Sequence, residues 1–283
     1  VADSIRFLKS KGRDVFLDAE HFFDGYKANK EYSLKVLKSA AEAGADCLVL
    51  CDTNGGALPE EIAEATRTVV AVVNVPVGIH AHNDAELAVA NTLAAVNAGA
   101  TQVQGTINGY GERCGNANLC SIIPALKLKM GFNVMENEKL GSLTELAHFV
   151  SEVANLAPDP FLPYVGHSAF THKAGLHVAG LSRWTFAYQH IDPASVGNKP
   201  RTLVSELSGK TNIIQRAREI GVDLSAKDKK VKFLLERVKE LESLGFQYEN
   251  AEASFDLLVH RASPSYQLPF ELIDFMVVVE KRR

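Results

Sequence analysis

The sequence lacks several features that would assign a class of protein at once. Only four of its 283 residues are cysteines (Cys47, Cys51, Cys114 and Cys120), and none of them forms a CxxC pair. This usage disfavours a zinc ribbon and a disulfide framework, and it favours reduced thiols in a cytoplasmic protein. There is no signal-peptide pattern and no apolar run of about 18 residues, so we expect no transmembrane helix.

An excess of positive charge is also absent. The 34 acidic and 30 basic residues give a formal net charge of −4. Electrostatic binding of nucleic acid or of an anionic membrane normally needs a basic excess, so we expect neither partner. Apolar residues make up 46% of the chain, which is ordinary for a soluble globular protein. The length predicts one large or two smaller domains.

What the sequence does contain, up to Gly131, is a repeat of strand-like and helix-like segments. Strand-like segments lie at residues 13–18, 46–51, 77–82 and 101–107. Helix-like segments follow them at residues 31–43, 60–74, 84–98 and 116–130. The spacing of about 30 residues is that of a βα unit, and runs of such units form parallel sheets, either doubly wound or closed into a barrel.

Four units are only half of an eight-fold barrel. The chain also begins with Val1 inside a helix-like segment, so we expect that the N-terminal half of a barrel is missing from it. The fold class predicted for residues 1–131 is therefore α/β, as the C-terminal half of a (β/α)8 TIM barrel.

After Gly131 the pattern changes, and residues 132–265 are expected to form mostly helical linker subdomains. Helix-like segments lie at residues 143–157, 205–220, 227–245 and 249–261, and a proline-containing connector lies at 158–165. The apolar run 270–280 is a candidate strand. We interpret residues 266–283 as the start of a regulatory domain.

Two histidines, His80 and His82, stand at the end of the third strand-like segment. In a strand, this spacing of two residues puts both imidazoles on one face. Two imidazoles that converge at a strand end are half of a site for a divalent metal. The alternative is that one histidine is a core residue and the other is solvated. Asn83 or Asp84 can cap the helix that follows.

Polar side chains also follow the other strand-like segments. They are Asp18 and Glu20, Asp52 and Thr53, and the residues between Asn108 and Asn116. Parallel α/β sheets and barrels bind their ligands at the carboxyl ends of the strands. These positions therefore predict one site at that edge.

Three motifs together carry a resemblance to a known family: GIHAHND at residues 78–84, GYGERCGN at 109–116 and FTHKAGLH at 170–177. With them, the chain resembles the acyltransferase branch of the DRE-TIM metallolyases, which holds the 2-isopropylmalate, homocitrate and citramalate synthases. The segment FLDAEHFFD at residues 16–24 looks closest to citramalate synthases. The family's Asp-x-Thr-Leu-Arg-Asp-Gly motif, which supplies an acidic metal ligand and a substrate-binding arginine, is absent.

The resemblance implies a reaction and its cofactors. Acetyl-CoA would undergo a Claisen condensation with a 2-oxo acid, pyruvate being favoured, and the thioester would then be hydrolysed. A divalent metal (Mg, Mn or Zn), a homodimer and a place in isoleucine or leucine biosynthesis are implied as well. Because half of the barrel and one metal-ligand motif are missing, we expect this chain to be inactive by itself.

The resemblance also suggests which residues bind the metal and the substrate. His80 and His82 match the family's ligand pair, and Asn116 matches a further residue at or near the metal. The position of Asn116 also fits a helix N-cap. Thr53 matches a substrate-binding threonine, and the alternative is a turn-forming hydroxyl.

Catalytic roles follow from the same resemblance. Glu20 matches the catalytic glutamate at the end of strand five, and His177 matches a histidine from the linker subdomain that acts as the base or with it. His172 is a further candidate. The alternatives are a solvated glutamate and surface or packing histidines. Glu112 and Arg113 are expected to form an ion pair that shapes the glycine loop, with substrate contact as the alternative.

Two other functions stay open at this point. An aldolase or lyase of the same superfamily would keep the fold but cleave its substrate, and the motif around His177 argues against it. The other function is not catalytic: a metal-binding assembly module whose helices at residues 205–261 serve oligomerisation.

Overall fold

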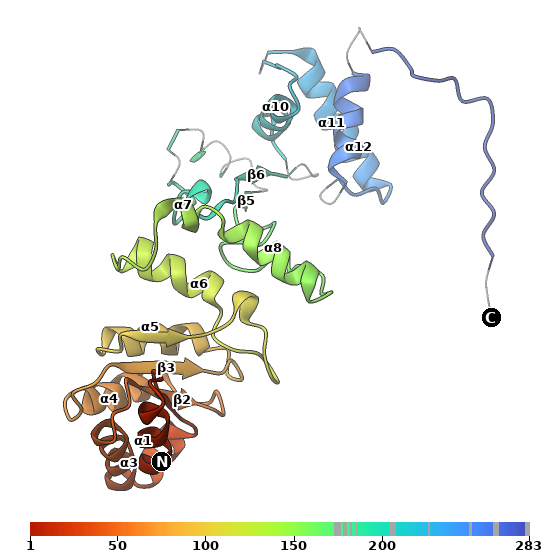
Figure 1. Cartoon of the computed structure of the whole chain (residues 1–283). Coiled ribbons are helices and arrows are strands. Elements are labelled where there is room, and N and C mark those ends of the chain that lie inside the picture. The colour runs from red at the N-terminus through yellow and green to blue at the C-terminus, as the bar shows by residue number, and fades with distance from the viewer. Residues whose placement is uncertain are drawn as a thin grey trace. The chain divides into compact units, whose positions relative to one another are not determined.

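The computed structural model forms two compact units, residues 1–170 with 191–199 and residues 171–190 with 200–283 (Figure 1). The residues that it describes are 1–172, 177, 180–181, 183–184, 186–203, 208–225, 227–248, 251–262 and 266–280. The expected domain limits at residues 131 and 265 stay predictions.

The first unit is built around a four-stranded parallel sheet in the order β1-β2-β3-β4. The strands are β1 (Phe16–Ala19), β2 (Cys47–Asp52), β3 (Val77–Ala81) and β4 (Gln102–Gln104). Their order in space equals their order in sequence, as in a barrel, whereas a doubly wound sheet reverses its order at a switch point. All six residues of β2 are buried, which explains why the first five of them form a continuous apolar run.

Five helices accompany these strands along the chain: α1 (Ala2–Ser10), α2 (Phe22–Ala28), α3 (Lys30–Glu42), α4 (Pro59–Val70) and α5 (Ala88–Asn97). Their apolar side chains, such as Leu37 and Ile62, share one core cluster with Leu48 and Leu50 of β2. Val49 lies between those two leucines in sequence but belongs to a separate cluster with Cys47 and Cys51. The alternation of side chains along β2 therefore gives the sheet one face that packs against the helices and a second face that does not.

Several helices differ from the expected ones in position or extent. The stretch after β1 contains α2, which the sequence pattern did not predict; its Phe22 and Phe23 are buried in the core. Helix α5 begins at Ala88 and not near Asp84, because Glu86 adopts a left-handed φ of 60° that interrupts a helix. The helix expected at 116–130 begins only at Leu119.

That last helix consists of two parts, α6 (Leu119–Pro124) and a π-helical turn, η2 (Ala125–Lys129). A short 3-10 turn, η1 (Ile107–Gly109), precedes it. Two further helices, α7 (Asn137–Leu140) and α8 (Leu143–Val153), and the 3-10 turn η3 (Pro193–Val196) complete the first unit.

A second core cluster joins these later elements. It contains Cys120, Leu140, Leu143, Phe170 and Val196, all of which are buried. Polar contacts to η3 also contribute, since the Thr144 hydroxyl donates to the Val196 carbonyl oxygen at 2.7 Å. These contacts explain why residues 191–199 belong to the first unit.

The second unit combines a small parallel ladder with helices. Strand β5 (Thr171–His172) pairs with β6 (Arg201–Thr202). The helices are α10 (Lys210–Glu219), α11 (Lys229–Ser243) and α12 (Glu252–Arg261), which pack around the buried Ile213, Leu234 and Phe255. The helical character expected for this region is therefore confirmed.

The strand expected at residues 270–280 is wrong. Residues 266–280 make no ladder with any described residue, and Ile273 is 94% exposed. A strand exists only with a hydrogen-bonding partner, so an apolar run alone does not produce one. Among the described residues, none of the helices combines the length and apolarity that crossing a bilayer requires.

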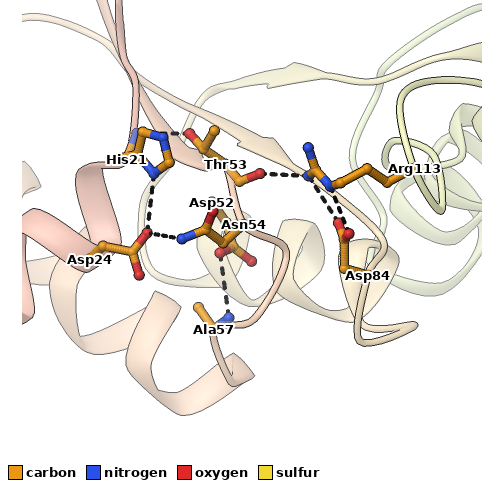
Figure 2. A network of polar contacts seen from close by, with 8 residues as sticks. All are labelled: His21, Asp24, Asp52, Thr53, Asn54, Ala57, Asp84 and Arg113. Carbon is orange, nitrogen blue, oxygen red and sulfur yellow. Dashed lines mark hydrogen bonds and ion pairs between the residues drawn. The ribbon is translucent and has the colours of Figure 1, made fainter.

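The loops at the carboxyl edge of the sheet are tied together by Arg113, which lies after β4 (Figure 2). Its Nε and Nη2 donate to the two carboxylate oxygens of Asp84, which follows β3, at 2.7 and 3.0 Å. Nη2 also donates to the carbonyl oxygen of Thr53, after β2, at 2.7 Å. The Glu112 contact that sequence reasoning favoured is longer, at 3.6 Å, and the Glu112 side chain is 84% exposed. The principal partner of Arg113 is therefore Asp84.

The loops after β1 and β2 are joined in a similar way. The backbone N–H of His21 donates to the Thr53 hydroxyl oxygen at 2.7 Å, and the Asn54 amide donates to the Asp24 carboxylate at 2.8 Å (Figure 2). Gly55 is required nearby, because its φ is +63° and an added Cβ would lie 2.5 Å from Asp84 Oδ2.

Asp52 lies buried beneath these loops and acts as a structural residue. Its carboxylate accepts from the backbone N–H of Ala57 at 3.4 Å and from Asn91 Nδ2 at 3.3 Å. Asn91 Nδ2 also donates to the Ala57 carbonyl oxygen at 2.8 Å. Burial raises the pKa of Asp52, and hydrogen bonds from Ala57 and Asn91 partly oppose that rise.

We expect Asn91→Leu to lower the free energy of unfolding by about 2–3 kcal/mol, because it leaves the Ala57 carbonyl and one Asp52 oxygen buried without their donor. Urea denaturation followed by circular dichroism measures the change. The matched control is Asn97→Leu at the exposed end of the same helix, which we expect to change the free energy by less than about 0.5 kcal/mol. Equal losses in the two variants would contradict this interpretation of Asn91.

We expect Arg113→Lys to loosen the loops at the sheet edge, since a lysine keeps the charge but cannot make the bidentate contact with Asp84. Hydrogen exchange should become several-fold faster at the amides of residues 105–118, and Arg67→Lys at an exposed position of α4 is the control. The contact with Arg113 lowers the pKa of Asp84. In the unchanged protein, the protection of these amides from hydrogen exchange should therefore be full at pH values above the ordinary carboxyl pKa. It should be lost as the pH falls through the lowered pKa of Asp84. Unchanged hydrogen exchange in Arg113→Lys would show that the Arg113–Asp84 contact does not hold these loops together.

Candidate functional site

A pocket of about 270 Å³ lies at the carboxyl edge of the sheet. Six residues line it: Asp18, Glu20, Cys51, Thr53, His80 and His82. The structure therefore brings four of the predicted site residues into one cavity, although three different strands supply them. A second cavity, of about 300 Å³ beside α8, is lined by Asn108 and Tyr110 from the loop after β4, but by none of the residues with a predicted catalytic, substrate-binding or metal-binding role.

The two histidines converge in this pocket. His80 Nε2 and His82 Nε2 are 3.3 Å apart, and the ring centroids are 5.1 Å apart. His80 lies in register with Cys51 of β2 and with Gln104 of β4. The geometry expected from the spacing of two residues, with both imidazoles on one face, is thus present.

His82 lies in surroundings that favour its neutral form. Burial lowers its pKa, and the neighbouring His80 and Arg113 lower it further. Its Nδ1 is buried and has no hydrogen-bond partner among the described residues. A neutral imidazole is the form that binds a metal ion.

Asn116 lies beside His82, to which it is joined by an isolated backbone bridge. Its Nδ2 donates to the Tyr110 carbonyl oxygen at 3.2 Å, whereas its Oδ1 is buried with no hydrogen-bond partner among the described residues. The N-cap alternative is wrong, because Asn118 caps α6 by accepting from the Cys120 N–H at 2.9 Å. A buried oxygen that lacks a donor is costly, and a cation would satisfy it.

These donors fit part of a divalent-metal site. Two nitrogens that are each about 2.1 Å from one ion lie about 3.0–3.4 Å apart, and the histidine nitrogens are 3.3 Å apart. Imidazole nitrogens with an amide oxygen are compatible with Mg, Mn or Zn. Within the described ranges, no group of three or more His, Cys, Asp or Glu side chains is arranged to hold a metal. The donor set therefore depends on Asn116 and has no acidic member.

Thr53 and Glu20 both line the pocket, where Thr53 is half-buried and Glu20 is exposed. The Thr53 hydroxyl oxygen accepts from the His21 N–H, so it serves the neighbouring loop and its own proton stays available for a substrate. Glu20 is exposed, and its backbone N–H donates to the Asp18 carbonyl oxygen at 3.0 Å. Both side chains are therefore accessible from the pocket.

Two residues at this site, Cys51 and Gln104, were not predicted as site residues from the sequence, and Asp18 was predicted only as one of the polar residues that follow the strands. Burial raises the pKa of Cys51 to about 12, so its thiol is unreactive at neutral pH. Gln104 Nε2 donates to Asp18 Oδ1 at 3.0 Å, and its Oε1 lies 2.8 Å from His80 Nδ1. The position of Gln104 in the strand-like segment 101–107 was the available signal, but its partners are set only by the tertiary structure.

His172 and His177 belong to the second unit. The His177 ring stacks on Tyr188 with centroids 4.1 Å apart, and His172 lies edge-on to it at 6.3 Å. Burial lowers the pKa of His172, and His177 contributes. Residues 173–176 of the same motif lie outside the described residues. The catalytic roles of the two histidines therefore stay predictions.

Two family descriptions match the chain. Residues 1–150 match the HMGL-like family, and residues 164–245 match the homocitrate synthase post-HMGL domain-like family. Together with the parallel βα sheet, the first match confirms the expected partial barrel. Among solved structures, an HMG-CoA lyase of Bacillus subtilis aligns with a TM-score of 0.48 and 21% identity, over 56% of this chain and 55% of that one.

Relatives of higher identity are also found. The chain is 53% identical over 282 residues to an (R)-citramalate synthase of Geobacter sulfurreducens, covering 100% of this chain and 53% of the relative. It is 50% identical over 284 residues to one of Aquifex aeolicus, covering 100% and 54%. The chain thus spans about half the length of these curated relatives. It belongs to the HMGL-like family, in the acyltransferase branch of the DRE-TIM metallolyases and close to the citramalate synthases.

Proposed function

We propose that the whole protein condenses acetyl-CoA with a 2-oxo acid, pyruvate by preference, and then hydrolyses the thioester to release citramalate and CoA. One observation carries the proposal: Glu20, Thr53, His80 and His82 share a pocket in a chain about half identical, along its full length, to relatives named (R)-citramalate synthase. A homodimer and a cytoplasmic location are part of the proposal and rest on the family resemblance.

His80, His82 and Asn116 are the residues that would hold a divalent cation. When bound, such an ion would polarise the ketone of the 2-oxo acid as a Lewis acid. The converging Nε2 atoms and the unsatisfied Asn116 Oδ1 support this assignment.

Thr53 is proposed to bind the substrate carboxylate. Its hydroxyl oxygen already accepts from the His21 N–H, so its proton is directed to another acceptor. The pocket that Thr53 lines also contains both histidines, which puts a carboxylate on Thr53 within reach of the same site. This arrangement orients the ketone carbon for attack.

Glu20 is proposed as the base that takes a proton from the acetyl methyl group. Its exposed side chain lines the pocket, and once the proton is removed the methyl carbon forms the new C–C bond with the ketone carbon. Water subsequently cleaves the thioester and CoA leaves. His177 is proposed to act as the base or with it, as the resemblance implies, and His172 is a further candidate.

The direct test is CoA release from acetyl-CoA by the full-length reading frame, with pyruvate, 2-oxoisovalerate or 2-oxoglutarate and with or without Mn²⁺ or Mg²⁺. We expect release with pyruvate alone and its loss on adding a chelator. The 283-residue chain by itself, which has no Asp-x-Thr-Leu-Arg-Asp-Gly motif, should show no turnover. Absence of release with all three acids, together with retro-aldol cleavage, would support a lyase instead.

Two variants of the full-length protein separate the base from the metal ligands. Glu20→Gln should lower kcat by about 10²–10⁴-fold while Mn²⁺ binding is unchanged, because only the proton acceptor is lost. His82→Ala should abolish both Mn²⁺ binding and turnover, whereas His148→Ala at an exposed position of α8 should change neither. If His82→Ala instead dissociates or unfolds the protein while metal binding persists, an assembly module is the better description.

A further inference from the structure

A chain of hydrogen bonds crosses the face of the sheet that contains the pocket. It runs from Asp18 on β1 through the Gln104 amide on β4 to His80 on β3, with distances of 3.0 and 2.8 Å. Strands β1 and β4 are the two outer strands of the sheet and are separated by β2 and β3. Their side chains meet because the sheet curls, as in a barrel.

The chemistry of Asp18 determines which group donates and which accepts in each of these hydrogen bonds. An ionised carboxylate only accepts hydrogen bonds, so the NH2 group of Gln104 must face Asp18. The amide oxygen of Gln104 then faces His80 and also accepts only. His80 Nδ1 must therefore carry the proton that donates to it, and in a neutral imidazole the other nitrogen, Nε2, then has a free lone pair.

That lone pair lies where a ligand is needed. His80 Nε2 is 3.3 Å from His82 Nε2, and both rings line the pocket. We infer that Asp18 and Gln104 fix the tautomer of His80 so that its Nε2 lone pair faces the pocket and binds the divalent cation. They are positioning residues, since they act through His80, and the part of the inference that concerns the cation rests on the proposed function.

The orientation of the Gln104 amide depends on Asp18. If Asp18 is replaced by asparagine, the amide at position 18 can donate as well as accept, and Gln104 can rotate its amide by half a turn. Its NH2 group would then donate to His80 Nδ1 and favour the tautomer with the proton on Nε2. That tautomer cannot bind a cation in the pocket. Loss of a residue that orients a metal-binding histidine typically costs about 10–100-fold in affinity.

The tautomer can be read directly in the metal-free chain labelled with ¹⁵N-histidine. Long-range ¹⁵N–¹H correlation should show His80 protonated on Nδ1 in the unchanged protein. Asp18→Asn should mix the two tautomers, and Gln104→Leu should remove the preference. The double variant Asp18→Asn with Gln104→Glu should restore it, because the new carboxylate accepts from both neighbours.

Asp24→Asn is the matched control. It removes the same charge at the same edge of the sheet, but Asp24 contacts Asn54 and His21 and not Gln104. We expect the His80 tautomer to be unchanged in this variant. A tautomer that shifts equally in Asp24→Asn and Asp18→Asn would mean that charge alone is responsible, and would overturn the inference. An unchanged tautomer in folded Asp18→Asn and Gln104→Leu would also overturn it.

Mn²⁺ titration of the same proteins by calorimetry tests the consequence for the metal. The dissociation constant should rise about 10–100-fold in Asp18→Asn, return toward its original value in the double variant and stay within about twofold in Asp24→Asn. If the tautomer shifts as expected but none of the proteins binds Mn²⁺, the assignment of the tautomer stands and the proposed metal site fails. The two proposals are therefore separable.

Discussion

The parallel register of the four-stranded sheet is the constraint on which the site depends. It places Cys51, His80 and Gln104 abreast on three neighbouring strands. Because side chains alternate along a strand, the same register directs Leu48 and Leu50 into the helix-covered core. A slip by one residue would exchange these two sets. The same register is therefore required both for a stable core and for the geometry of the pocket.

The loops at the carboxyl edge add a second level of order. Arg113 holds three of them through one guanidinium group, and Thr53 is held by the backbone of the loop before it. Functional side chains on loops are precise only when neighbouring groups fix them. Here the residues that would contact substrate are few, and most of the polar contacts around them serve to hold these few in place.

The histidine pair shows how such support gives a chemical property. Neither ring nitrogen of His80 is intrinsically the protonated one, and the sequence contains no information about this choice. The Gln104 amide transmits the acceptor-only character of Asp18 to His80. The hydrogen-bonding capacity of one carboxylate thus decides which nitrogen of His80 carries the proton.

Local patterns were sufficient for the repeat of strands and helices, because apolar alternation and glycine stops depend on neighbouring residues. They also predicted that His80, His82, Thr53 and Glu20 lie together at the carboxyl edge of the sheet, whereas the roles of these residues come from the family resemblance and stay predictions. They failed for α2, where Phe22 and Phe23 are buried only through packing, and for residues 270–280, where an apolar run has no partner strand in the part of the chain that the structure describes. Only the tertiary structure joined Asp18 to Gln104, because residues 86 positions apart meet through sheet curvature and not through any local preference.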